Sequence, residues 1–452
     1  MHTKFIHRDW TQGNLINNLL SLATPVIINQ SLNLLGPLID MIWIGRLGSS
    51  AVAGVGVASF VVLLVTAARM GFAVGVRAMI ARNVGAKDNT GANHAAQQAF
   101  VISGGYFFVI AFIGIFFSEG IMSLMGVEAD VAAIGAAYMR VMFIGSAAMS
   151  FRFVTDSIMQ ASGDTITPMR ITIVFRIIHL IICPVLIFGW WIFPHLGVKG
   201  AALANIISQS IGLFIGLWFL FYGKTRLHLT LKDFSLDGSM IWRIIKIGIP
   251  ATIIGIERHL ANILLLFFLT PFGTVAVAAH SICHRVDIFL TMPAIGLGIG
   301  SGVLAGQYIG AKQPKRAEKN GWLAVSLGSG LGVLFAACVF FEAETIAGIF
   351  NKEPETLNMA TDFLKIASIG LLTVGFNVVL SQTISGTGDT FPPMLISILS
   401  LWVVQIPLAY LLPRSTGFGV YGVRWGMVWG VITAGVAFTI YFKLGRWKFK
   451  KV

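Results

Sequence analysis

The chain has 452 residues, of which 56% are hydrophobic and 11% are charged. Because soluble domains carry about 25% charged residues, this composition excludes a soluble globular protein and indicates a chain that crosses a membrane many times. The formal net charge is +13, but the basic residues lie in short polar segments between apolar runs. This placement is typical of loops anchored at the cytoplasmic membrane surface, so we expect no nucleic-acid partner.

A membrane span needs about 20 apolar residues, and twelve such runs follow one another along the chain. The runs are 15–45, 51–82, 94–117, 133–160, 167–190, 199–222, 242–270, 276–309, 320–341, 358–385, 392–412 and 422–444. They predict an all-α polytopic membrane protein. The predicted domains are an N-lobe, 1–223, with helices one to six; a cytoplasmic inter-lobe linker, 224–240; and a C-lobe, 241–452, with helices seven to twelve.

The two halves repeat the same motifs at a constant distance of 225 residues. A fixed offset over much of each half indicates two homologous six-helix lobes with almost no insertions. Duplication of this kind in a membrane protein is typical of transporters. The repeated motifs are Pro25 and Pro250, Gly85-Ala86-Lys87 and Gly310-Ala311-Lys312, and Gly163-Asp164-Thr165 and Gly388-Asp389-Thr390.

Lysine and arginine are unevenly distributed over the loops. The N-terminus, the even-numbered loops and the C-terminal tail are rich in them, whereas the odd-numbered loops carry only Arg46, Lys199, Lys352 and Arg414. Because basic loops stay on the cytoplasmic side, both termini are expected to be cytoplasmic. The start of the chain has no signal-peptide pattern. We therefore expect a multi-pass protein of the cell inner (plasma) membrane.

Asp40 and Glu257 are carboxylates inside apolar spans, where burial in hydrocarbon is costly. Asp40 lies near the outer end of the first span, six residues before Arg46, and Pro25 and Pro37 permit that helix to bend. Glu257 lies near the middle of the seventh span. Each is a candidate cation-coupling site. The alternatives are a surface ion pair with Arg46 for Asp40, and a structural pair with a basic residue of another helix for Glu257.

His280, His284 and Asp287 follow one another at i, i+4 and i+7, on one face of the eighth span. A polar stripe facing a cavity is favoured over a metal site, because no further His/Glu cluster and no H-E-x-x-H motif accompany them. The three cysteines lie in apolar segments without a C-x-x-C pair. No metal, cofactor or enzyme motif is therefore expected.

Other charged residues within the spans bear on these candidates. Arg69 and Arg176 also lie within spans, and neutralisation of Asp40 or Glu257 by one of them is an alternative to a coupling role for that acid. Arg152 and Asp156 are spaced i, i+4 and are expected to form a pair on the helix surface.

Several motifs resemble those of the multidrug and toxic compound extrusion (MATE) transporters, over nearly the whole chain. The first-helix stretch LATPVIINQSLNLLGPLIDMIWIGRLGSSAVAGVG resembles that family's opening segment, with the D-x-x-x-x-G-x-L-G pattern at Asp40 to Gly48. The segments GDTITPM and GDTFPPM, the twin GAK turns and GVKGAALAN at 197–205 are also similar.

The resemblance implies two six-helix lobes in a V around a central cavity, and export of small organic cations and other amphipathic drugs in exchange for Na⁺ or H⁺. It implies a cation site at Asp40, a bending point at Pro25, and a match of Glu257 to the seventh-helix glutamate of NorM-like and eukaryotic members. Asn33, His179 and Asn205 complete the candidate site. A monomer in the lipid bilayer is expected, with H⁺ or Na⁺ as coupling ion.

The fifth helix departs from the family pattern N-x-x-N-x-x-x-D-P. The aligned stretch carries Arg176, His179, Cys183 and Pro184. Because Na⁺ prefers oxygen ligands and Arg176 would repel it, the sequence favours proton coupling centred on Asp40, Glu257, or both. Two rival interpretations remain: a lipid-linked precursor flippase of the same superfold, which needs a cationic cavity, and a membrane-embedded transferase.

Overall fold

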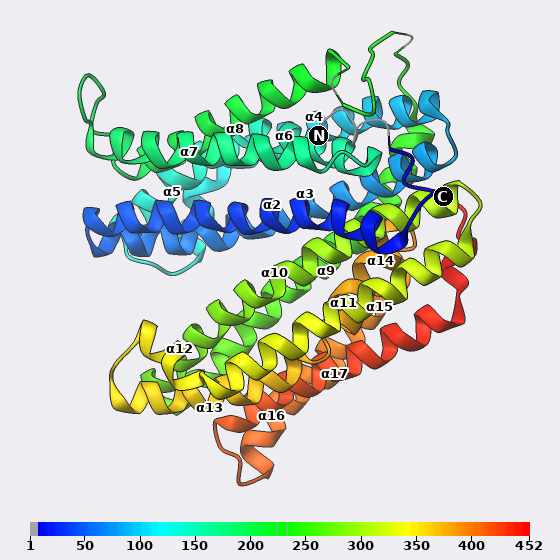
Figure 1. The fold of residues 1–452 in the computed structure, drawn as a ribbon. Helices are drawn as coiled ribbons and strands as arrows, with labels where there is room; N and C mark the ends of the chain where they lie inside the picture. Colours follow the sequence, from blue (N-terminus) through cyan, green and yellow to red (C-terminus); the bar gives the residue numbers. More distant parts are fainter. Residues whose placement is uncertain (1–7, 224, 233) are drawn as a thin grey trace. The chain divides into compact units, whose positions relative to one another are not determined.

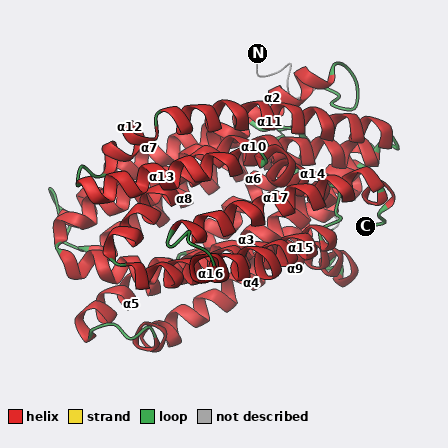
Figure 2. Ribbon diagram, turned by 90° about the horizontal axis from the view of Figure 1, so that it is seen from below, coloured by secondary structure: helices red, strands yellow, loops and turns green. Residues whose placement is uncertain are grey.

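A computed structural model of the chain describes residues 8–223, 225–232 and 234–452. These residues form helices and loops, with no strand among them (Figures 1 and 2). Within the described ranges, ten helices are long and apolar enough to cross a membrane, and two helix pairs, bent by 47° and 49°, bring the number to twelve. The predicted fold class is confirmed. The start of the predicted N-lobe, 1–7, and positions 224 and 233 of the predicted linker lie outside the described residues.

One compact unit consists of Ile28–Thr252 with residues 8–9. This unit includes α2 from Ile28 onward and α9 as far as Thr252. Within it α7 packs along α8, and α3 packs on α5 and α6. Its helices are α2 (Leu15–Ile44), α3 (Ser49–Gly85), α4 (Asn89–Leu124), α5 (Ala129–Ile144), α6 (Ser146–Ser162), α7 (Ile166–Phe188), α8 (Val198–Phe221) and α9 (Gly238–Leu269).

The other compact unit consists of Trp10–Ile27 and Ile253–Val452. Within it α10 packs on α11 and α14, and α16 packs on α17. Its helices are α10 (Thr274–Gly310), α11 (Pro314–Phe341), α12 (Ala343–Phe350), α13 (Pro354–Leu371), α14 (Leu380–Gly386), α15 (Phe391–Ile398), α16 (Ile406–Ser415) and α17 (Tyr421–Leu444), and two π-helical segments are η3 (Gly375–Val379) and η4 (Leu399–Gln405).

The sequence repeat is also present in the structure, in the positions at which equivalent helices begin. Helices α3 and α10, α4 and α11, α5 and α13, and α7 and α15 start 225 residues apart. Lys87 and Lys312, the third residues of the two GAK turns, both have positive φ, 62° and 59°, which L-residues seldom adopt. The offset falls to 223 at the start of α8 and α17. The two halves therefore share one backbone plan until the fifth helix of each.

Glycines let the two shared helices pack closely inside each unit. A Cβ at Gly71 of α3 would lie 2.5 Å from the Thr252 nitrogen of α9, and one at Gly296 of α10 would lie 2.7 Å from Ile27 Cα of α2. These two contacts are again 225 residues apart. Each falls where α9 or α2 passes from one unit to the other. Helix α2 is continuous through Pro25, and the bending role of Pro25 stays a prediction.

The polar stretch after α8 is held against the first turns of α4. Asn93 Nδ2 and Gln97 Nε2 both donate to the Thr230 carbonyl, at 3.1 and 2.7 Å. Asp237 caps α9 by accepting from Met240 N at 3.1 Å, and its other oxygen lies 3.2 Å from His94 Nε2. The Met240 N–H, followed by the His94 contact, lowers the pKa of Asp237. The predicted lobe boundaries at 223 and 241 stay predictions.

Candidate functional site

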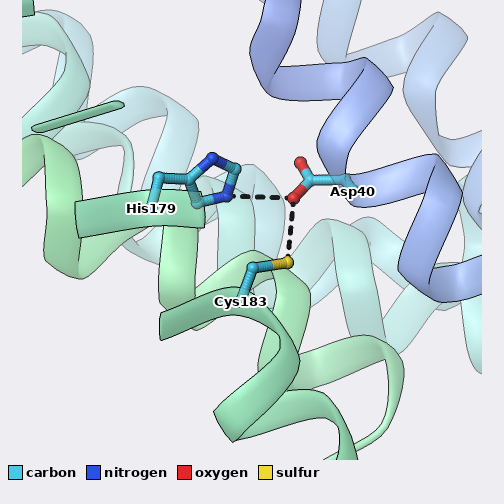
Figure 3. A group of neighbouring side chains, drawn as sticks. All are labelled: Asp40, His179 and Cys183. Atoms are coloured by element: carbon cyan, nitrogen blue, oxygen red, sulfur yellow. Dashed lines mark hydrogen bonds and ion pairs between the residues drawn. The ribbon is translucent and has the colours of Figure 1, made fainter. Parts of the chain in front are cut away.

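Asp40 of α2 meets two side chains of α7 (Figure 3). Its Oδ1 lies 3.0 Å from His179 Nε2 and accepts a hydrogen bond from the Cys183 thiol at 3.5 Å. All three side chains are buried; Asp40 is 5% exposed. The spacing of His179 and Cys183 by four residues puts both on one face of α7. A carboxylate inside a span is thus surrounded by two groups that can donate a proton.

Arg176, one turn before His179, completes this network. Its Nη1 lies 3.2 Å from His179 Nδ1, and its Nη2 donates to the Asn33 carbonyl at 3.4 Å. Gly36 of α2 leaves the space for the guanidinium, since a Cβ there would collide with it. Because arginine only donates hydrogen bonds, Nδ1 is the acceptor, which leaves Nε2 as the ring nitrogen that can carry a proton toward Asp40.

This arrangement suits a proton better than a metal ion. The ligand atoms of Asp40, His179 and Cys183 lie within 4.8 Å of one another, close enough in principle to share an ion. A metal-bound histidine, however, normally donates its other ring N–H to an acceptor, and here that nitrogen faces the donor-only Arg176. The Asn33 side chain reaches Asn29 Oδ1 at 3.5 Å rather than Asp40.

A second polar network lies in the same unit. Arg152 Nη1 contacts Asp156 Oδ2 at 2.5 Å, and its Nε donates to Gln209, which in turn donates to Asn205. The pair was predicted on the helix surface; that placement is wrong, because the two side chains are only 4% and 8% exposed. Phe175 connects the two networks, since Arg152 and Arg176 lie 4.5 and 5.1 Å from its ring.

Glu257 of α9 is 4% exposed, and neither carboxylate oxygen has a hydrogen-bond partner within the described part of the chain. Its polar neighbours are Ser397, at the end of α15, and Trp402, within the π-helical segment η4, although neither meets hydrogen-bond geometry. π-Helical segments are frequent at functional sites. An unsatisfied buried carboxylate is costly, so this environment suits a group that binds a cation or a proton.

The histidine stripe of α10 is partly as predicted. The rings of His280 and His284 stack with centroids 6.2 Å apart and an interplanar angle of 7°. Asp287 instead faces the buried Arg424 of α17, at 3.8 Å. His259, next to Glu257 in sequence, lies within electrostatic reach of His284. These residues form a polar cluster in the second unit.

The structure therefore brings some of the predicted residues together and separates others. Asp40, His179 and the Asn33 carbonyl belong to one network, while Asn205 belongs to the Arg152 network. The alternative surface pair of Asp40 with Arg46 is wrong, because Arg46 is exposed and stacks on Trp43 at 4.7 Å. Cys183, a partner of Asp40, is not among the site residues that the sequence predicts. The signal was present in the spacing of Arg176, His179 and Cys183 along one helix face.

Comparison with known proteins agrees with this fold. The profile of the MatE family matches residues 25–185 and 250–411. The chain is 28% identical over 432 residues to the probable multidrug resistance protein YoeA of Bacillus subtilis, covering 94% of this chain and 92% of that one. It is 24% identical to the probable multidrug resistance protein NorM of Thermotoga maritima, covering 96% and 93%. A crystal structure of MATE in the bent conformation superposes with a TM-score of 0.89 at 23% identity, covering 97% and 96%.

These findings define a polytopic helical transporter fold. The chain belongs to the MatE family, which is a family of transporters. That membership confirms the resemblance predicted from the repeated motifs, and it fits the expectation that the chain is not an enzyme.

Proposed function

We propose that this transporter is a secondary active multidrug efflux antiporter, which exports organic cations and other amphipathic drugs in exchange for protons by alternating access. We place it in the inner (plasma) membrane as a monomer, with both termini cytoplasmic. The relatives named as multidrug resistance proteins support the substrate class. Each ligand would bias the equilibrium between inward- and outward-open states through its differential affinity for them.

The choice of proton over Na⁺ rests on one observation, the surroundings of Asp40. Its buried Oδ1 faces an imidazole and a thiol, which are poor ligands for a hard cation that prefers oxygen. The Arg176 guanidinium behind His179 adds a positive charge that repels Na⁺. A proton needs no ligand shell, and the buried Asp40 carboxylate offers it an oxygen.

Glu257 provides a second acidic position in the other unit. Its two unpartnered oxygens beside Ser397 and Trp402 suit a carboxyl group that is protonated in one state and faces a cation in another. In this proposal the deprotonated acids favour binding of a cationic drug from the cytoplasm, and protonation from outside releases it. Glu257→Gln, which mimics the protonated form, would then bind cationic substrate weakly at every pH.

The test is transport in proteoliposomes under separate gradients of pH and Na⁺. Uptake or release of a fluorescent organic cation should follow the pH gradient and remain unchanged when Na⁺ is replaced by K⁺ at constant ionic strength. Transport that ignores the pH gradient and responds to Na⁺ would overturn proton coupling.

A flippase for an anionic, lipid-linked precursor is the second candidate, favoured by the arginines within the spans. Arg69, Arg176, Arg258 and Arg424 all lie within helices long and apolar enough to span a membrane. Competition separates the two candidates: an efflux pump is inhibited by excess organic cation, whereas a flippase is inhibited by an amphipathic pyrophosphate and not by the cation.

A further inference from the structure

Arg69 is a charged residue in the middle of the long span α3, and no carboxylate pairs with it within the described residues. Its Nη2 donates to Thr66 Oγ1 at 3.2 Å, and its Nε is buried with no hydrogen-bond partner in the described ranges. Its charged or titratable neighbours are Tyr106 and Arg152, and Arg152 repels it. A positive charge within a membrane is costly unless a counter-charge compensates it.

The two acids of this polar region are already engaged. Asp156 is bound to Arg152, and Asp40 lies against His179, with Arg176 behind the imidazole. Arg69 is therefore the guanidinium of this region that has no acid to pair with in the described part of the chain. It neighbours Arg152, whose own partner is Asp156. Besides the Thr66 hydroxyl, the guanidinium lies over the face of Phe153, whose ring centroid is 5.6 Å from the guanidinium carbon.

A small cavity, with room for about one water-sized group, opens beside this guanidinium, between α3, α4 and α6. Its polar groups include Ser150 of α6, which is 1% exposed and whose hydroxyl has no partner among the described residues. The Tyr106 hydroxyl is occupied, because it donates to the Val65 carbonyl. The other lining residues are Phe72, Ile102, Ser103, Phe153 and Val154.

The size and chemistry of the cavity select the ligand. Sites for drug-sized molecules occupy roughly 300–1,000 Å³, far more than this cavity offers, so only a single small ion or a water-sized group fits. A guanidinium N–H and a serine hydroxyl that both lack acceptors can be satisfied by one anion between them. Aromatic and aliphatic walls exclude a strongly hydrated, multiply charged ion, because its desolvation would cost more than the two contacts return.

We propose that this cavity binds a small monovalent anion of the halide class, held by the Arg69 guanidinium and the Ser150 hydroxyl. The anion neutralises the charge that the protein leaves unpaired within the span and ties α3 to α6. The site is separate from the Asp40 network and does not depend on the transported substrate or the coupling ion.

Thermal unfolding of the purified full-length protein tests the proposal. The protein is titrated with sodium chloride against sodium gluconate at constant pH and ionic strength, so that only the anion changes. Because a ligand that binds only the folded state raises its stability with concentration, we expect a saturable rise in melting temperature with chloride, reproduced by bromide.

Variants assign the effect to this site. Arg69→Gln should lose the chloride response, and in gluconate it should melt no lower than the wild type, because the unpaired charge is gone. Ser150→Ala should weaken the apparent chloride affinity by about tenfold, the effect of one hydrogen bond to a charged group. Arg140→Gln, which removes an exposed arginine paired with Glu119, is the control and should keep the full response.

Three results would overturn the proposal: a wild-type melting temperature that does not depend on chloride, an Arg69→Gln variant that keeps the response, or an unchanged chloride affinity in Ser150→Ala. The serine variant removes only one hydroxyl and decides the question even if the arginine variant does not fold.

Discussion

Replacing Asp156 by leucine should destabilise the protein strongly, while replacing its partner Arg152 at the same time should restore most of the loss. The two side chains are 4% and 8% exposed and 2.5 Å apart. Removing one member of such a buried pair costs about 3–5 kcal/mol, because the remaining charge is left uncompensated. Gln209 and the Phe175 ring still contact Arg152, so we expect the lower end, about 3 kcal/mol for Asp156→Leu.

The assay is equilibrium unfolding in mixed micelles of the single variant Asp156→Leu, the double variant Arg152→Met/Asp156→Leu, and a surface control. Glu119→Leu is the control, because Glu119 and Arg140 are 73% and 42% exposed, and loss of an exposed pair costs less than about 1 kcal/mol. If Asp156→Leu costs no more than Glu119→Leu, or if the double variant is no more stable than the single one, the buried pair does not govern this region as we describe.

Three further predictions concern the coupling site, the helix packing and the linker. Asp40→Asn should abolish substrate-driven exchange while the protein stays folded, because the amide cannot titrate; undiminished exchange in proteoliposomes would make Asp40 structural. Gly296→Ala should cost about 1–3 kcal/mol by overpacking against α2, whereas Gly330→Ala, with open space around it, should not; equal melting temperatures would refute the close packing. Protection of residues 234–240 from hydrogen exchange should persist from pH 8 to 5 and fall only below about pH 4. The pKa of Asp237 is lowered in the folded protein, so the stability that its carboxylate contributes is complete above the ordinary carboxyl pKa and is lost as pH falls through the folded-state pKa. Loss of protection already at pH 6, or full protection in Asp237→Ala, would contradict the cap and its contact with His94.

The elements that could be predicted from the sequence are those that depend on local pattern. Twelve apolar runs define the spans, and the 225-residue repeat predicts that equivalent helices begin at equivalent positions, as α3 and α10 do. The π-helical segment η4 has no such signal, because π-helical hydrogen bonding follows from packing against neighbouring helices rather than from residue spacing.

The contacts that make the site depend on tertiary structure and were harder to predict. Asp40 was identified because an acid within a span is unusual, and Arg152 and Asp156 because they are spaced i, i+4. Asp40 is 139 residues from His179 and 143 residues from Cys183 along the chain, so no local sequence pattern predicts that they meet. Burial of the Arg152 pair likewise depends on α7 and α8, which sequence spacing on α6 does not reveal.

The central claim is that protons, and not Na⁺, are exchanged for the organic cation. It is tested most directly by counting the protons released when purified protein binds an organic cation in weakly buffered detergent solution, in Na⁺ and in K⁺ salts of equal ionic strength. We predict that binding releases protons in both salts, with equal affinity, and that Asp40→Asn releases fewer. Binding that releases no protons and requires Na⁺ would contradict the account.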